Sequence, residues 1–162
     1  MQSKDILTLT EALGEKLLFH KMILTTVESC TGGLFSAQIT NTPGSSIWFD
    51  RGFITYSNQS KIDCVKVKKN TIEKFGAVSQ QTADEMALGG INNSQGNIAL
   101  SITGIAGPKG GSQLKPIGTI FFGIAKKENI IFQQKAFFEG NREEIREKAV
   151  LFALNQLLAL TL

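Results

Sequence analysis

The stretch Met22-Ile23-Leu24-Thr25-Thr26-Val27-Glu28-Ser29-Cys30-Thr31-Gly32-Gly33 contains an apolar, β-branched run that ends in polar residues and two glycines. Residues 22–27 predict a short strand, and residues 34–39 resume with helical character. The first N–H groups of a helix have no partner within it, and glycines let a ligand approach the backbone. Such a turn can hold an oxyanion or a phosphate. A simple Ser/Thr helix cap followed by flexible glycines is the alternative.

Helical and strand patterns alternate on both sides of this turn. The expected elements are helices over 4–19, 34–39 and 79–91, strands over 22–27, 52–56 and 97–102, and short helical pieces near 61–65 and 71–75. This alternation favours an α/β sheet covered by helices on both faces.

The C-terminal part of the chain adds a different element. Strands over 119–125 and 130–138, joined by a tight turn at 126–129, predict an antiparallel hairpin, so the sheet should be mixed. A last helix begins near Asn141, and no repeat or interdomain linker interrupts the chain. We therefore expect one compact domain over residues 1–162.

Composition excludes several classes of protein. The chain has 162 residues, 42% hydrophobic and 19% charged, which is typical of a globular domain and not of a disordered one. The net charge is +3 and the basic residues are scattered, which argues against nucleic acid and is compatible with a small anionic ligand.

Cysteine and histidine usage is sparse. Two cysteines make no disulfide framework, and a single histidine, His20, leaves zinc without Cys/His ligands. No run of 18 apolar residues predicts a membrane span, and the amphipathic N-terminus lacks the apolar core of a signal peptide. We expect a cytoplasmic protein without a bound metal.

Three polar segments follow predicted strands, at 28–33, 56–61 and 101–111. Open α/β sheets bind ligands outside the carboxyl ends of their strands, so these segments should meet at one site. Ser29 is a candidate nucleophile but needs a base, and His20 at a helix end is better explained as a surface or capping residue. Lys61 can replace histidine if its pKa is depressed, with Tyr56 as a relay. The alternative is a packed Tyr56 and an ordinary solvated Lys61.

The glycine- and proline-rich segment 104–118 is long for a loop in a compact domain. Its lysines and glycine amides suit a phosphate or carboxylate, although it lacks P-loop spacing and could also be a flexible lid. Arg142 opens the last helix, where its guanidinium could bind a phosphate or simply pair with a carboxylate at the surface.

Taken together, motifs spread over nearly the whole chain resemble the CinA C-terminal domain family, in particular its stand-alone nicotinamide-nucleotide amidases. The matching stretches are 26–33, 44–46, 52–58 with Lys61, 76–79, 103–108, 110–111, 115–119 and Phe138-x-Gly140-x-Arg142.

The resemblance implies a single three-layer α/β/α domain with a mixed, mostly parallel sheet. It implies hydrolysis of nicotinamide mononucleotide to nicotinic acid mononucleotide and ammonia without a metal or organic cofactor, and it suggests a homodimer. The family's catalytic serine, tyrosine and lysine correspond to Ser29, Tyr56 and Lys61. The expected substrate contacts are Cys30, Thr31, Gly32, Gly33, Thr103, Gly104 and Arg142.

Two other interpretations remain open at this point. Cys30 could be the nucleophile, because a thiolate at a helix N-terminus is activated by the helix dipole. The chain could also be a non-catalytic nucleotide-binding or competence-related interaction module.

Overall fold

The computed structural model describes residues 3–161 and places five strands of this range in one sheet. The strands are β1 (Leu24–Glu28), β2 (Phe49–Ile54), β3 (Ile98–Gly104), β4 (Thr119–Lys126) and β5 (Asn129–Phe137), in the spatial order β2-β1-β3-β4-β5. β1 pairs in parallel with both β2 and β3, whereas β4 is antiparallel to β3 and to β5. Four strands therefore run in one direction, which confirms the mixed, mostly parallel sheet and the C-terminal hairpin.

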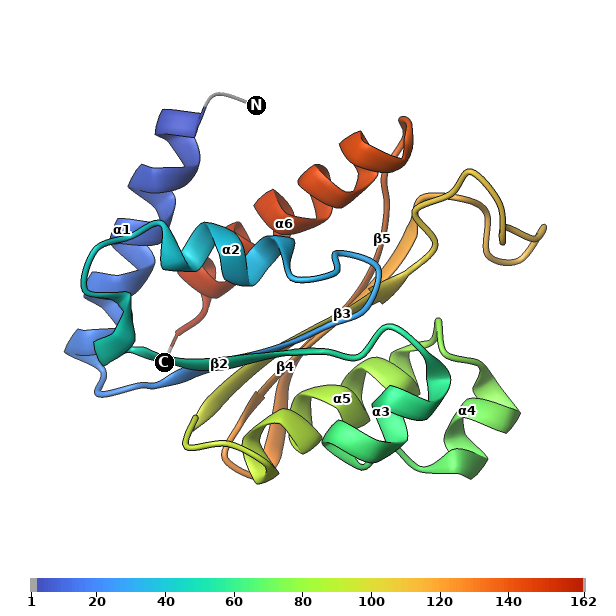
Figure 1. Ribbon diagram of the computed structural model, residues 1–162, viewed down its shortest axis with the longest axis horizontal. Helices are drawn as coiled ribbons and strands as arrows, with labels where there is room; N and C mark the ends of the chain where they lie inside the picture. The colour runs from blue at the N-terminus through green and yellow to red at the C-terminus, as the bar shows by residue number, and fades with distance from the viewer. Residues whose placement is uncertain (1–2, 162) are drawn as a thin grey trace.

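Helices cover both faces of this sheet (Figure 1). On one face lie α1 (Ser3–Phe19), α2 (Leu34–Thr40) and α6 (Arg142–Ala159); on the other lie α3 (Asn58–Val65), α4 (Lys69–Phe75) and α5 (Gln80–Asn92). A short 3-10 turn, η1 (Ser45–Ile47), precedes β2. The three-layer α/β/α arrangement is confirmed.

The core follows from the apolar faces that the sequence predicts. The central strands β1 and β3 are almost wholly buried, as are the inward-facing side chains of α1, α2, α5 and α6, among them Leu13, Leu17, Phe35, Ile39, Met86, Ile145, Ala149 and Ala153. The edge strands β2 and β5 are more exposed, because each has a neighbour on one side only. Within residues 3–161, no helix combines the length and apolar character needed to cross a bilayer.

The second strand lies earlier than predicted. β2 begins at Phe49 and ends at Ile54, and Tyr56 belongs to the connection that follows it. The reason is local, since the Ser57 hydroxyl caps α3 by accepting from the Ser60 N–H at 3.0 Å. Helix α3 therefore starts at Asn58, several residues before the expected helical piece.

All five strands begin or end at the edge of the sheet where β1, β2 and β3 have their carboxyl ends. Glu28 at the end of β1 is paired with Ile54 and Ile102, so the carboxyl ends of β1, β2 and β3 meet there. β4 begins at this edge, and β5 ends at it before the chain enters α6. The three predicted polar segments and the start of the last helix are thereby gathered on one side of the molecule.

Gly89 of α5 offers a test of the packing between α5 and α3. A Cβ at this position would lie 1.8 Å from the backbone oxygen of Val65, an overlap that only a backbone shift can relieve. We expect Gly89→Ala to lower the free energy of unfolding by about 2 kcal/mol or more, measured by urea denaturation. Gln81→Ala, at an exposed position of the same helix, should stay within about 0.5 kcal/mol of the unsubstituted protein. Equal stability of the two variants would contradict the close approach.

Candidate active site

Ser29 extends β1 by one residue into the turn. Its backbone N–H donates to the Ile102 carbonyl oxygen at 2.9 Å, and its side chain is 8% exposed. Gly32 and Gly33 follow with φ angles of 59° and 92°, in the left-handed region that glycine adopts at low cost, and α2 starts at the next residue. The predicted strand–turn–helix junction is therefore present, with the serine at the strand end.

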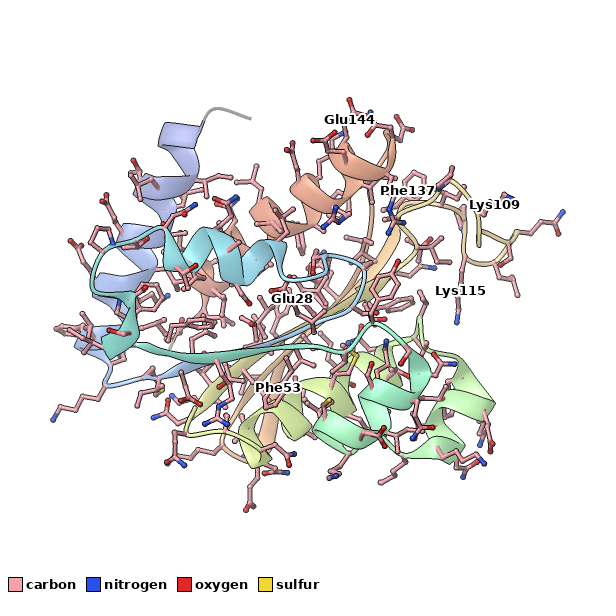
Figure 2. All side chains as sticks on the ribbon, viewed as in Figure 1. Glu28, Phe53, Lys109, Lys115, Phe137 and Glu144 are labelled. Carbon is pink, nitrogen blue, oxygen red and sulfur yellow. The ribbon has the colours of Figure 1, made fainter. Side chains whose placement is uncertain are left out.

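Glu28, immediately before this serine, anchors the turn. Its fully buried carboxylate accepts hydrogen bonds from the N–H groups of Gly33 (3.1 Å), Phe35 (3.1 Å) and Ser36 (2.9 Å) and from the Ser36 hydroxyl (2.6 Å). Figure 2 shows Glu28 between the sheet and α2. The carboxylate satisfies amides that the helix leaves unpaired and complements its dipole. Sequence reasoning gave Glu28 no role, although an acidic residue just before a strand-to-helix turn was a usable signal.

This arrangement bears on the expectation that the backbone amides of the turn hold an oxyanion or a phosphate. Gly32 donates its N–H to the Ser29 carbonyl oxygen at 3.1 Å and Gly33 donates to Glu28, so neither amide is free for an oxyanion. The carbonyl oxygen of Thr31 accepts from Arg146 Nη2 at 2.7 Å. Thr31, Gly32 and Gly33 are not among the residues that line the pocket with Ser29, and their contact with a substrate stays a prediction.

Lys61 reaches Ser29 from the first helix after β2. Lys61 and Val65 form the buried stripe of α3, and the lysine is 1% exposed. Its Nζ lies 2.9 Å from Ser29 Oγ, 2.6 Å from the Thr55 carbonyl oxygen and 3.5 Å from that of Tyr56. These partners suit a neutral amine, whose two N–H groups can donate to the carbonyls while its lone pair accepts the serine proton.

Burial lowers the pKa of Lys61 to about 8, because the charged ammonium loses its hydration. A lysine with such a pKa is neutral in about a tenth of molecules at pH 7, far more than an ordinary lysine. It can therefore serve as a base toward the hydroxyl that it contacts. The arrangement has the parts of a serine–lysine dyad.

Cys30 is in a different environment from its neighbour. It is 6% exposed and belongs to the apolar core, and burial raises the pKa of its thiol to about 12. The side chain is thus a protonated thiol at neutral pH, whereas nucleophilic cysteines are thiolates. Ser29, and not Cys30, contacts the lysine amine.

A pocket of about 280 Å³ opens over this pair of residues. Its walls are formed by Ser29, Cys30, Tyr56, Lys61, Ala77, Val78, Thr103, Gly104, Ile105, Ala106, Gly107, Lys109, Gly110 and Arg142. Seven of the expected site residues are therefore brought together, and no acidic side chain is among those lining this pocket. Thr103 is nearly fully buried, and its hydroxyl donates to the Ala77 carbonyl oxygen at 2.8 Å.

Tyr56 and Arg142 meet at the pocket mouth. The Tyr56 ring is 60% exposed, and its phenol accepts a hydrogen bond from Arg142 Nη2 at 3.0 Å. Arg142 Nη1 donates to the Gly107 carbonyl oxygen at 2.6 Å. Lys61 contacts the backbone carbonyl of Tyr56, while the Tyr56 phenol is turned to the guanidinium. The geometry therefore does not support a proton relay from Lys61 through this phenol.

The remaining candidates fall outside the pocket. His20 follows α1 and packs edge-on against Phe19, with 5.0 Å between ring centroids, and it is not a pocket residue. Lys115, expected among the anion-binding lysines, donates instead to the backbone oxygens of Phe75 and Val78. Within residues 3–161, no group of three or more His, Cys, Asp and Glu side chains is placed to hold a metal ion.

Known proteins resemble this chain over nearly all its length. It is 45% identical over 154 residues to the nicotinamide-nucleotide amidohydrolase PncC of Enterobacter agglomerans, covering 95% of this chain and 94% of that protein. The PncC protein of Escherichia coli K12 is 40% identical, with 97% and 95% covered. The crystal structure of the competence/damage inducible protein CihA from Agrobacterium tumefaciens superposes with a TM-score of 0.91 at 39% identity, covering 96% of this chain and 94% of that one.

The family comparison agrees with these relatives and with the fold. The model of the CinA C-terminal domain matches residues 6–161, which includes every strand and the turn that carries Ser29. The chain belongs to the CinA C-terminal domain family.

Proposed function

We propose that this protein hydrolyses the carboxamide of nicotinamide mononucleotide, giving nicotinic acid mononucleotide and ammonia. The observation that carries the proposal is the 2.9 Å contact between Lys61 Nζ and Ser29 Oγ at the base of a pocket. The substrate is inferred from relatives named nicotinamide-nucleotide amidohydrolase, which are 40–45% identical over nearly their whole length.

Ser29 is the proposed nucleophile and Lys61 its general base. Ser29 Oγ attacks the carboxamide carbon while Lys61 Nζ takes the hydroxyl proton, and the resulting ammonium then protonates the leaving amino group. Ammonia departs and an ester links the acyl group to Ser29. Water attacks this ester, Lys61 takes the proton of the water, and the acid leaves as the ammonium returns that proton to Ser29. Lys61 Nζ thus accepts and then donates each proton that the two half-reactions transfer.

The pocket mouth suits the phosphate end of the substrate. Arg142 and Lys109 are the cationic side chains there besides the buried lysine, and a guanidinium binds phosphate through two parallel hydrogen bonds. The Arg142 hydrogen bonds to Tyr56 and Gly107 hold the guanidinium over the opening. We therefore assign Arg142 to phosphate binding and Tyr56 to shaping its position.

A non-catalytic binding module is the competing function, and ammonia release separates the two. A purified protein that binds nicotinamide mononucleotide but releases no ammonia over hours would be such a module. The homodimer suggested by the family resemblance and the cytoplasmic location expected from the sequence stay predictions.

Substitution of the two neighbouring candidates identifies the nucleophile. We expect Ser29→Ala to lower kcat for ammonia release by at least about a thousandfold, because the acyl-enzyme can no longer form. Cys30→Ala should retain kcat within about tenfold, since it removes a core thiol and not a reacting group. Hydroxylamine should divert the acyl group to a hydroxamate in the unsubstituted protein and in Cys30→Ala, but not in Ser29→Ala. Turnover in the serine variant with loss in the cysteine variant would reverse the assignment.

The pH profile reports the state of Lys61. Because the base must be neutral, kcat/KM should rise as pH increases through about 8 and level off above it, following the lowered pKa of this lysine. Below that pH the fall should approach tenfold per pH unit, as expected for one proton. Lys61→Arg, which stays charged, should remove activity at every pH tested. A profile flat between pH 6.5 and 9 would contradict the role of the lysine.

Arg142→Gln tests the phosphate contact. We expect KM for nicotinamide mononucleotide to rise at least about tenfold with kcat changed less than threefold, because binding is lost equally in the ground and transition states. Nicotinamide riboside, which has no phosphate, should show no such change. Arg51→Gln, an exposed arginine of β2 paired with Asp50, is the matched control. An equal effect on both substrates would assign Arg142 to another part of the site.

A further inference from the structure

The glycine-rich loop between β3 and β4 is a folded part of the pocket. At its base Ile105 N–H donates to the Thr119 carbonyl oxygen at 2.9 Å, and Gly118 N–H donates to that of Ile105 at 2.7 Å. Gly107 and Gly111 of the loop pack closely against Ile117, since a Cβ on either would come within 2.8–3.0 Å of its side chain. A freely moving lid would lack such internal contacts.

Lys115 ties this loop to a distant part of the chain. Its backbone N–H donates to the Ser112 hydroxyl (3.1 Å) and its carbonyl oxygen accepts from the Ser112 N–H (2.9 Å), which forms a tight turn. From this turn Nζ reaches the carbonyl oxygens of Val78 at 2.6 Å and Phe75 at 3.1 Å. Figure 2 shows the side chain directed from the loop toward the helices on the other side of the opening.

The segment that Lys115 holds is one wall of the active-site pocket. Ala77 and Val78 line the pocket together with the loop residues 105–107. Two consecutive carbonyls of this wall are bound by side chains from elsewhere, that of Ala77 by Thr103 of β3 and that of Val78 by Lys115. The wall is thus fixed from the sheet and from the loop.

We propose that Lys115 is a positioning residue that sets the distance between the glycine-rich loop and the Ala77–Val78 wall. Its ammonium donates to carbonyl oxygens instead of binding the substrate phosphate. This proposal depends on the proposed function in one respect: it takes nicotinamide mononucleotide as the ligand of the pocket.

The hydrogen-bond partners of Lys115 Nζ indicate that its positive charge has a structural role. Within the described range 3–161, no carboxylate oxygen lies within 4 Å of Lys115 Nζ, so backbone oxygens are its partners. Hydrogen bonds from a charged donor are stronger than those between neutral groups. Lys115 can therefore hold its own loop to Val78 and Phe75, which precede it by 37 and 40 positions in the sequence.

Lys115→Met tests the proposal, since it keeps the apolar stem and removes the donors. We expect KM for nicotinamide mononucleotide to rise about tenfold and kcat to stay within about threefold, with the pH profile unchanged. Amide hydrogen exchange should accelerate in residues 104–118 and 75–79 but not in the central strands. Lys115→Arg, which still has donors for both carbonyls, should recover most of the KM and of the exchange protection.

Lys69→Met is the matched control, because it removes an exposed lysine of α4 whose nearest carboxylate, Glu73, is 3.6 Å away. It should leave KM and exchange unchanged. Unchanged exchange of residues 104–118 in Lys115→Met would overturn the proposal, as would acceleration throughout the chain or a loss confined to kcat.

The exchange measurement separates this proposal from the function proposed above. If the unsubstituted protein releases no ammonia, the enzymatic proposal fails. Faster exchange confined to the loop and its wall would then still support the role of Lys115, and unchanged exchange would overturn that role as well.

Discussion

The parallel pairing of β1 with β2 on one side and β3 on the other is the constraint on which the site depends. It sets Glu28 level with Ile54 and Ile102, so the residues after these three strand ends must meet at one edge. Side chains alternate between faces along a strand, and a register shift of one residue would turn Ser29 away from the helix that carries Lys61. The sheet register thus determines whether the serine and the lysine face each other.

Around this edge, buried polar groups are matched to partners in two different ways. The Glu28 carboxylate accepts hydrogen bonds from the first amides of α2 and thereby stabilises the turn. The N–H of Gly33 is one of these donors, so it is not free to bind a substrate. Lys61 is buried among carbonyl oxygens and a hydroxyl, none of which neutralises an ammonium. Its desolvation costs stability when the amine is charged, and the same desolvation lowers its pKa and makes it a base.

Three lysines of this protein illustrate how environment decides the use of one side chain. Lys61 is buried against Ser29, with which it exchanges a proton in the proposed function, whereas Lys109 is an exposed residue of the pocket lining. Lys115 reaches the backbone oxygens of Phe75 and Val78, the second of which lines the pocket. Sequence patterns could not separate these roles, because each lysine sits near a glycine or a strand end and differs only in what the fold places beside it.

The sequence by itself determined the order of elements and the strand-to-helix turn, because hydrophobic periodicity, helix caps and glycines are local signals. The helices that begin near Ser79 and Asn141 and the hairpin between β4 and β5 were predicted for this reason. Only the tertiary structure decided that Glu28 occupies the amides of the turn, that the Tyr56 phenol faces Arg142, and that the Cys30 thiol is largely buried and packs with the apolar core. These outcomes depend on burial and on contacts between segments far apart in the chain, which set pKa values and hydrogen-bond partners and leave no local pattern in the sequence.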